Sequence, residues 1–478
     1  LSLEQSSRTE FYRRNFVSFP TFDVSISIFT KLTMSTNIKR ARRSWNVPVS
    51  KMAENTFNPI RNIVDSMKMT PNPDKAMISL SIGDPTVFGN LPHSESCEQA
   101  VIDCIKKRTF NGYAPSVGYE LARQAVADYV STQTSKVEAK DIILASGCSG
   151  ALDLCISCLA EPGHNILIPR PGFSLYKTLA ESLGIQVRHY NLLPERSWEV
   201  DLEHLESLID DNTKAVIVCN PSNPCGSVYS KEHLLDIIDT VGRNLVPIIA
   251  DEIYEHFVFS GNTYHSIASL SKEVPVLACS GLTKRYLIPG WRLGWIVIND
   301  RDDIFSAVRK GLTKLSQRIL GPNTLIQSAL PDIFKNTPQS FYADTLKYIE
   351  NNAKIFYEYL CDVPGLYPVM PQGAMYMMVG IDMKSFPFKS DVDFTEKMIT
   401  EESVFCLPAT CFQYPNFFRV VLTVPTEKVI EACERIRMFC ERHLMPGRDT
   451  SKRYNYSTKI VSNGSHLTAC EKIFEAEK

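Results

Sequence analysis

Short apolar runs of strand length alternate with segments of helical periodicity through the middle of this chain. The apolar runs cover residues 142–145, 166–169, 215–219, 247–250, 276–279 and 293–298. Helical periodicity fills the gaps, as over residues 152–159, 174–183 and 231–241. Strands that alternate with helices in this way predict an α/β fold, in which helices cover both faces of a mostly parallel sheet.

The length of the chain predicts a second, smaller unit, because 478 residues are too many for one simple core at ~150 residues per domain. Helical segments over 302–360 lead to a smaller α+β unit, with strands near 375–379 and 419–422 and a closing helix near 428–442. We predict a leader and basic tail (1–50), an N-terminal segment that packs on the small domain (51–112), a large domain (113–345), a small domain (346–445) and a flexible tail (446–478).

The first residues of the chain lack periodicity. Residues 1–33 precede Met34, and we interpret them as a non-native or poorly ordered leader. A transit peptide is poor in acidic residues, whereas this segment holds Glu4, Glu10 and Asp23. We therefore expect a cytoplasmic protein and leave mitochondrial targeting open.

The composition excludes several classes of partner. A net charge of −2 gives no electrostatic footprint for nucleic acid, and no run of ~18 apolar residues predicts a membrane span. Fourteen scattered cysteines favour a reducing compartment. Cys155 and Cys158 form a C-x-x-C without a second pair, so we interpret them as core residues and expect no metal site.

Ligands collect beyond the carboxyl ends of the strands in such sheets, so the residues after each run carry the chemical information. The first run is followed by Ser146-Gly147-Cys148-Ser149-Gly150, directly before a helix. Small residues let backbone N–H groups approach an anion there, and the helix dipole favours it. The segment is a candidate phosphate site, although a glycine-rich turn also serves packing alone, and it lacks the Gly-Lys-Ser/Thr of a P-loop.

Four further residues follow later runs. Phe173 comes after a rigid Pro-Arg-Pro-Gly turn and is either a core ring or a stacking surface for a ligand. Asn223 brings an amide beyond its strand, within a loop of ordinary turn formers. Asp251 ends a buried run, where a carboxylate is costly without a cationic partner, and Tyr254 can place a phenol nearby.

The stretch from Cys279 to Trp295 carries Lys284 and Arg292. Alone, it is either a basic surface turn or the site of a reactive lysine, because a lysine beside a buried run is costly unless its amine is used chemically. The planar fork of Arg292 suits phosphate. Together the strand ends offer what pyridoxal 5'-phosphate needs: a Schiff-base lysine, a carboxylate for the pyridinium, donors to the 3-oxygen, a stacking ring and phosphate ligands.

The order of these motifs resembles the class I aminotransferases of fold type I. The matching motifs lie within roughly residues 58–443 and include NPIRNIVDSMK, SGCS, PRPGFSLY, NPSNPCG, ADEIY, SGLTKRYLIPGWRLGW and FFRVVLT. The resemblance implies a large domain with a seven-stranded, mostly parallel sheet and a smaller α+β domain. It also implies ping-pong transamination, in which L-tyrosine gives 4-hydroxyphenylpyruvate and 2-oxoglutarate gives glutamate.

The resemblance implies a role for each residue at the strand ends. Lys284 would form the Schiff base and move the Cα proton, and Asp251 would keep the pyridine nitrogen protonated. Tyr254 and Asn223 would bind the 3-oxygen, and Phe173 would stack on the ring. The phosphate would be held by Gly147, Cys148, Ser149, Thr283 and Arg292. Many members of the family carry a serine at the position of Gly281, so Ser280 or Thr283 would compensate here.

Other residues complete the implied site. Arg419 would clamp the substrate α-carboxylate, rather than pair with a surface acid, and Asn223 would also face the substrate. Gly83 would permit close approach of the substrate. Tyr113 would reach across an interface to the phosphate of a neighbouring subunit, so a homodimer is expected.

Three alternatives remain at this stage. An alanine or kynurenine aminotransferase would share the cofactor site and differ in the side-chain pocket. A lyase of the aminocyclopropane-carboxylate-synthase type would need no oxo-acid acceptor. A transcription regulator would need a winged helix-turn-helix before the domain, and residues 1–50 are too short and aperiodic for one.

Overall fold

The computed structural model describes residues 47–67 and 70–446 of the chain. The described residues from Val49 onward belong to one compact unit, which contains every helix and strand given below. Residues 1–46 of the predicted leader and residues 447–478 of the predicted tail lie outside the described residues. The boundaries expected between a large and a small domain remain a prediction.

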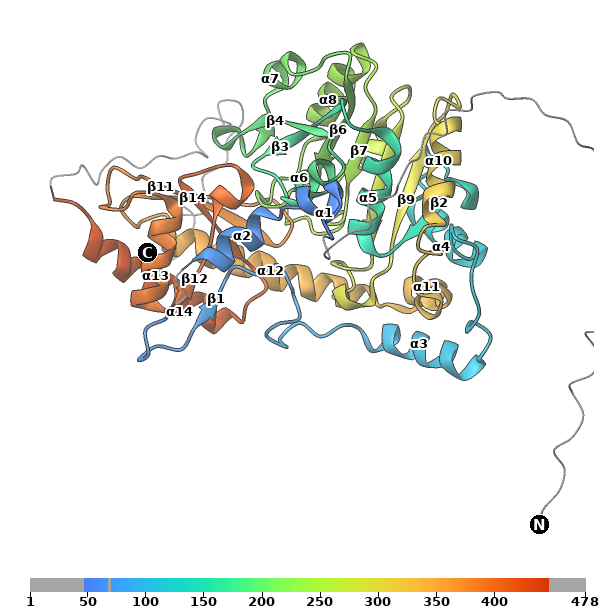
Figure 1. Cartoon of the computed structure of the whole chain (residues 1–478). Helices are drawn as coiled ribbons and strands as arrows, with labels where there is room; N and C mark the ends of the chain where they lie inside the picture. The colour runs from blue at the N-terminus through green and yellow to red at the C-terminus, as the bar shows by residue number, and fades with distance from the viewer. Residues whose placement is uncertain (1–46, 68–69, 447–478) are drawn as a thin grey trace, which may run out of the picture. The chain divides into compact units, whose positions relative to one another are not determined.

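The larger sheet has eight strands in the order β2-β9-β8-β7-β6-β3-β4-β5 (Figure 1). They are β2 (Ile142–Ala145), β3 (Asn165–Arg170), β4 (Gln186–Leu193), β5 (Glu199–Val200), β6 (Thr213–Cys219), β7 (Ile248–Asp251), β8 (Val276–Gly281) and β9 (Gly294–Asn299). The strands from β8 to β4 pair in parallel, whereas β9 is antiparallel to both its neighbours and β5 is antiparallel to β4. The mostly parallel sheet is thus confirmed, with the two-residue β5 added to the seven strands expected.

Both faces of this sheet are covered, which explains the apolar runs in the sequence. Ile143 and Ile249 belong to one core cluster, while Ile142 and Ile248 belong to the other. Successive side chains of a strand point to opposite faces, so a strand buried on both sides must be apolar throughout. Helix α5 (Gly147–Leu159) packs in the first cluster, and helices α4 (Glu120–Val130), α8 (Lys231–Arg243) and α11 (Thr324–Asn336) pack in the second.

The smaller sheet is antiparallel, with strand order β10-β11-β14-β13. Its strands are β10 (Leu366–Val369), β11 (Tyr376–Ile381), β13 (Leu407–Pro408) and β14 (Phe417–Val421). Helices α13 (Asp391–Glu402) and α14 (Thr426–His443) accompany it, and the long helix α12 (Gln339–Leu360) contacts both α14 and β10 (Figure 1). This is the smaller α+β unit expected from the sequence.

Part of the N-terminal segment folds onto this smaller unit. Strand β1 (Ile78–Ser79) pairs in parallel with β12 (Val404–Phe405). Helices α1 (Lys51–Asn55) and α2 (Pro59–Ser66) precede it, and Met67 packs against Ile399 and Phe405. Helix α3 (Glu95–Lys107), in contrast, packs on α11 beside the larger sheet. The segment therefore bridges the two sheets.

The remaining elements are α6 (Leu175–Ser182), α7 (Leu202–Ser207), α9 (Ile267–Leu270), α10 (Ser306–Ser316) and the short 3-10 helices η1 (Ala139–Asp141), η2 (Pro194–Arg196), η3 (Pro289–Trp291) and η4 (Ala409–Phe412). None of the helices in the described part of the chain combines the length and apolar character needed to cross a membrane. Over the same residues, His, Cys, Asp and Glu side chains form no group of three or more that could hold a metal ion. Cys155 is fully buried and Cys158 packs against the same core, as interpreted from the sequence.

Candidate active site

A cavity of about 450 Å³ opens where the parallel strands of the larger sheet end. Its wall also includes residues from α2, from the segment after β1 and from the smaller sheet. The cavity brings together all the site residues expected from the sequence except Gly147 and Tyr113, namely Gly83, Cys148, Ser149, Phe173, Asn223, Asp251, Tyr254, Thr283, Lys284, Arg292 and Arg419.

Lys284 follows β8 and is half-buried in the cavity wall. Its Nζ donates a 2.6 Å hydrogen bond to the carbonyl oxygen of Gly83 and lies 5.9 Å from the centroid of the Tyr254 ring. A Cβ at position 83 would clash with the hydroxyl of Tyr376, so only glycine fits there. Because its amine is held at the cavity wall by Gly83, Lys284 is part of the cavity rather than of a basic surface turn.

Asp251 ends β7 and is 3% exposed. Its Oδ2 accepts a 2.6 Å hydrogen bond from the Tyr176 hydroxyl, and its Oδ1 accepts from the Ile253 N–H at 3.3 Å and from Cys148 Sγ at 3.6 Å. Burial raises the pKa of Asp251, while these hydrogen bonds and the charge of Lys284 act in the opposite direction. The carboxylate is thus fixed in orientation by three donors.

Two phenols meet beside the lysine. The hydroxyls of Tyr254 and Tyr376 lie 2.8 Å apart, and both side chains are buried. Burial raises the pKa of Tyr254 well above its ordinary value, and the neighbouring Tyr376 adds to the effect. Tyr254 therefore stays protonated and can donate a hydrogen bond into the cavity.

The guanidinium of Arg419, on β14, is buried without a carboxylate partner among the described residues. Its Nη1 donates to Asn223 Oδ1 at 3.0 Å and its Nη2 donates to the Ser81 carbonyl oxygen at 2.7 Å, but Nε has no partner. The rings of Tyr376 and Phe412 lie 4.2 and 5.0 Å from its Cζ. Burial lowers the pKa of Arg419. A buried cation with an unused donor is costly unless an anion binds it.

Arg292, which follows η3, contacts the N-terminus of α5, where the sequence predicted a phosphate site. Its Nη2 donates to Ser149 Oγ at 2.8 Å and to the Ser146 carbonyl oxygen at 3.0 Å. Gly147, the first residue of α5, has a φ of +71°, and a Cβ there would clash with the Arg292 guanidinium. Gly147 does not line the cavity, but its lack of a side chain is what lets Arg292 reach the helix N-terminus.

Of the two residues expected to compensate for Gly281, Ser280 or Thr283, only Thr283 lines the cavity. The Ser280 hydroxyl donates to Glu255 Oε1 at 3.2 Å and to the Glu252 carbonyl oxygen at 3.4 Å, and it does not line the cavity, whereas Thr283 does. A Cβ at position 281 would lie 2.7 Å from the Leu293 carbonyl oxygen. A serine cannot be placed at position 281 without shifting strand β9.

Tyr113 lies outside the cavity and is 90% exposed, on the loop between α3 and α4. Several residues of the site were missed in the sequence: Tyr176, Tyr376, Ser81 and Arg61. Only Tyr176 carried a usable signal, because it comes three residues after Phe173 at the start of a helical pattern.

The profile of the family described as aminotransferase class I and II matches residues 75–436. The chain belongs to this family, and the fold and the cavity above are those of an aminotransferase.

Similar proteins refine this assignment. The tyrosine aminotransferase of Mus musculus is 58% identical over 423 residues, which cover 88% of this chain and 93% of that protein. The crystal structure of tyrosine aminotransferase from Leishmania infantum matches with a TM-score of 0.81 at 35% identity, covering 84% of this chain and all of that one. An alanine aminotransferase from Pyrococcus furiosus matches with a TM-score of 0.77 at 29% identity, covering 83% of this chain and all of that one.

Proposed function

We propose that this chain is a pyridoxal-5'-phosphate-dependent aminotransferase that transfers the amino group of L-tyrosine to 2-oxoglutarate. The observation that carries the proposal is that one cavity holds three groups: the amine of Lys284, the buried carboxylate of Asp251 and the buried guanidinium of Arg419, whose Nε has no partner. A lysine nucleophile, a carboxylate and an anion clamp are the three groups that amino-group transfer requires.

The residues present fit pyridoxal 5'-phosphate. Arg292 and Ser149 meet at the N-terminus of the 13-residue helix α5, and together with its free backbone N–H groups, including those of Gly147 and Cys148, they form a donor set for phosphate. Thr283 adds a hydroxyl to the same cavity, and Phe173 adds an aromatic ring. When bound, the cofactor supplies the electron sink for the Cα carbanion and carries the amino group between the two half-reactions.

Asp251 and two hydrogen-bond donors would set the charge on the cofactor ring. Asp251 would hold the proton on the pyridine nitrogen, and the donors that surround the carboxylate oppose the rise in its pKa that burial causes. Tyr254 would donate to the 3-oxygen. The Oδ1 of Asn223 is occupied by Arg419, so its amide N–H groups would face the 3-oxygen or the substrate.

Lys284 would move the proton. Acting first as a general base, its amine would take the proton from the substrate Cα. Acting then as a general acid, it would deliver that proton to C4′ of the cofactor. The Gly83 carbonyl oxygen holds the amine at the cavity wall, and the absence of a side chain at Gly83 lets the Tyr376 hydroxyl pack beside it.

Arg419 would bind the α-carboxylate of each substrate. Its Nε has no partner in the protein and its Nη atoms are already oriented by Asn223 and Ser81, so a carboxylate can complete the guanidinium without disturbing its position. Both half-reactions need this clamp, since tyrosine and glutamate share the same α-carboxylate.

The choice of tyrosine rests on the relatives and on the wall of the cavity. The two tyrosine aminotransferases are more similar in sequence than the alanine aminotransferase. The protein from Mus musculus is 58% identical and that from Leishmania infantum 35% identical, against 29% for the alanine aminotransferase. Ile60 and Val64 from α2 and Phe405 from β12 give the cavity an apolar side that suits an aromatic ring. Arg61 adds a guanidinium besides those of Arg292 and Arg419, which would suit the distal carboxylate of 2-oxoglutarate.

We further propose that the enzyme is a cytoplasmic homodimer, in which the exposed Tyr113 reaches the phosphate of the partner's site. Within each chain, the large domain would span residues 113–345 and the small domain residues 346–445. Light scattering of the purified enzyme tests the dimer. A fall in the affinity of Tyr113→Phe for the cofactor tests the shared site.

The function is tested by incubating the purified protein with L-tyrosine, 2-oxoglutarate and pyridoxal 5'-phosphate and measuring 4-hydroxyphenylpyruvate. Product that requires all three additions supports the proposal. Turnover of alanine or kynurenine without turnover of tyrosine would contradict the substrate and leave the cofactor assignment standing. Lys284→Ala should abolish product and the visible absorbance of lysine-bound cofactor, and retention of both would contradict the assignment of the lysine.

A further inference from the structure

Two carbonyl oxygens of the N-terminal segment accept hydrogen bonds from two of the cations in the active site. Ser81 accepts the 2.7 Å hydrogen bond from Arg419 Nη2, and Gly83 accepts the 2.6 Å hydrogen bond from Lys284 Nζ. Strand β1, just before them, is only two residues long. The position of these carbonyl groups therefore depends on what fixes the segment before β1, as well as on the hydrogen bonds of β1 and Leu80.

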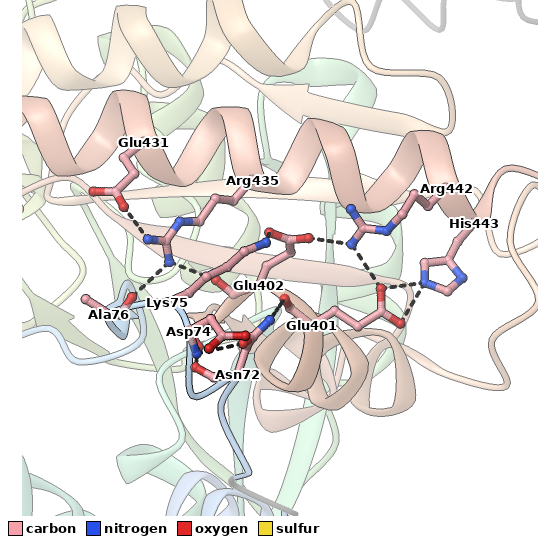
Figure 2. Close-up of polar contacts among 11 residues, drawn as sticks. Asn72, Asp74, Lys75, Ala76, Glu401, Glu402, Glu431, Arg435, Arg442 and His443 are labelled. Carbon is pink, nitrogen blue, oxygen red and sulfur yellow. Dashed lines mark hydrogen bonds and ion pairs between the residues drawn. The ribbon is translucent and has the colours of Figure 1, made fainter.

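Residues 72–76 are fixed by polar contacts to the C-terminal end of α13 and to Arg435 in the middle of α14, as Figure 2 shows. Asn72 Nδ2 donates to the Glu401 carbonyl oxygen at 2.9 Å, and Lys75 Nζ lies 2.5 Å from Glu402 Oε2. Arg435 Nη1 donates to the carbonyl oxygens of Ala76 and Glu402, at 2.8 Å each. Four residues separate Lys75 from Leu80, whose N–H and C=O are hydrogen-bonded to Phe405 and Val421.

Glu402 is the centre of this group. Its side chain is fully buried, and Lys75 and Arg442 reach its carboxylate from opposite sides (Figure 2). The two ion pairs differ in what they join: Arg442 lies on α14 and ties it to α13, whereas Lys75 ties the N-terminal segment to α13. A buried carboxylate is costly without cations, so both pairs hold their elements in place.

We propose that Lys75 is a positioning residue for the transamination: its ion pair with Glu402 holds the segment that carries Ser81 and Gly83, and thereby keeps Arg419 and Lys284 oriented for the substrate. This inference rests on the proposed role of Arg419 as the carboxylate clamp. Lys75 touches no residue of the cavity wall and acts only through the chain that follows it.

The expected effect falls on binding rather than on the chemical step. Without Lys75 the segment spends part of its time displaced, so only a fraction of the molecules have an assembled site. The apparent affinity for the amino acid falls in proportion to that fraction. Once the substrate is bound the site is assembled, so kcat changes little. Asn72 and Arg435 still hold the segment, so the loss of one partly exposed ion pair raises KM by at most about fivefold.

Lys75→Met and Arg442→Met form a matched pair, because each removes one cation from the same carboxylate. In the holoenzyme, Lys75→Met should raise KM for L-tyrosine by up to about fivefold with kcat within about twofold, and Lys75→Arg should restore KM. Arg442→Met should lower the melting temperature without this change in KM. Hydrogen exchange should quicken in peptides covering residues 76–83 for Lys75→Met only.

Equal changes in KM for the two variants, or unchanged exchange in residues 76–83 of Lys75→Met, would overturn the inference. If Lys75→Met does not fold, Lys75→Gln, which keeps a donor but no charge, takes its place under the same two criteria. The exchange measurement needs no substrate. A protein without tyrosine turnover that still shows the difference in exchange would contradict the proposed function and leave the anchoring of the segment intact.

Discussion

The hydroxyl of Tyr176 donates a 2.6 Å hydrogen bond to Oδ2 of Asp251, and both side chains are buried. Asp251 is the carboxylate assigned to the pyridine nitrogen of the cofactor, so Tyr176 acts on the electron sink through it. A hydrogen bond to a charged group contributes ~1.5–3 kcal/mol. The phenol therefore offsets a large part of the penalty that burial places on the ionised carboxylate.

Tyr176→Phe should raise the pKa of Asp251 further, because the burial stays while the strongest donor is lost. We expect kcat for the tyrosine half-reaction to fall about tenfold, and the pH titration of the cofactor absorbance to shift. Tyr190→Phe is the control, since its buried hydroxyl donates to the Ile217 carbonyl oxygen instead. Equal kinetic effects of the two variants would mean that Tyr176 serves packing alone.

Arg419→Lys keeps a positive charge but loses the planar fork and the free Nε. Because truncation of a buried, hydrogen-bonded charge pair costs ~2–5 kcal/mol, kcat/KM should fall on the order of a hundredfold. The loss should be similar for tyrosine and glutamate, which share the α-carboxylate, and the affinity for pyridoxal 5'-phosphate should not change. Stopped-flow measurement of each half-reaction checks this. A loss confined to one substrate would assign Arg419 to side-chain recognition.

Much of the fold follows from the sequence because the parallel strands are buried on both faces. Such strands are continuous apolar runs, and Ile248 to Ala250 is visible for that reason. Strand β4 was not found among the runs, because Tyr190 and Leu192 are buried while their neighbours are partly exposed. The short β1, β5 and β12 lack any signal of their own, since two residues carry no periodicity.

The site was predictable where a polar residue follows a buried run. Asp251 and Lys284 stand out on that ground. Tyr376 does not, because a tyrosine suits a strand in any protein and the partner of its hydroxyl, Tyr254, lies 122 residues away in the chain. Tyr176 had a signal in its spacing from Phe173, but its pairing with Asp251, 75 residues away, did not show in the sequence. The direction of the Ser280 hydroxyl, toward Glu255, is likewise set by packing between distant segments.

Gly281→Ser should weaken the site. The new Cβ would lie 2.7 Å from the Leu293 carbonyl oxygen and 2.9 Å from Gly294 Cα, and both are backbone atoms that must shift. Overpacking of this kind costs ~1–3 kcal/mol. We expect a lower melting temperature and a weaker affinity for pyridoxal 5'-phosphate. Gly290→Ser, with no atom within 4 Å of its added Cβ, is the control. Tighter cofactor binding in Gly281→Ser would show that β9 shifts to accommodate the serine, and would contradict the prediction.

Glu252, next to Asp251, makes the stability of the protein depend on pH. Burial, and then the charge of Glu255, raise the pKa of Glu252 to about 8, although Ser266 and the Ile267 N–H donate to its carboxylate. The folded state therefore binds a proton that the unfolded state releases near pH 4.5. The stability linked to this group is fully present below pH 4.5 and is lost as the pH rises toward 8, by at most about 1.4 kcal/mol per pH unit.

Glu252→Gln cannot ionise, so its free energy of unfolding should fall less steeply between pH 5 and 8 than that of the unsubstituted protein. Denaturant titrations at several pH values measure the difference. Glu350→Gln is the control: interactions with Lys354 and Ser260 outweigh burial and lower the pKa of Glu350, so that group is ionised throughout this range in both states. A difference between Glu252→Gln and the unsubstituted protein that stays constant from pH 5 to 8 would show that Glu252 is already ionised in the folded protein.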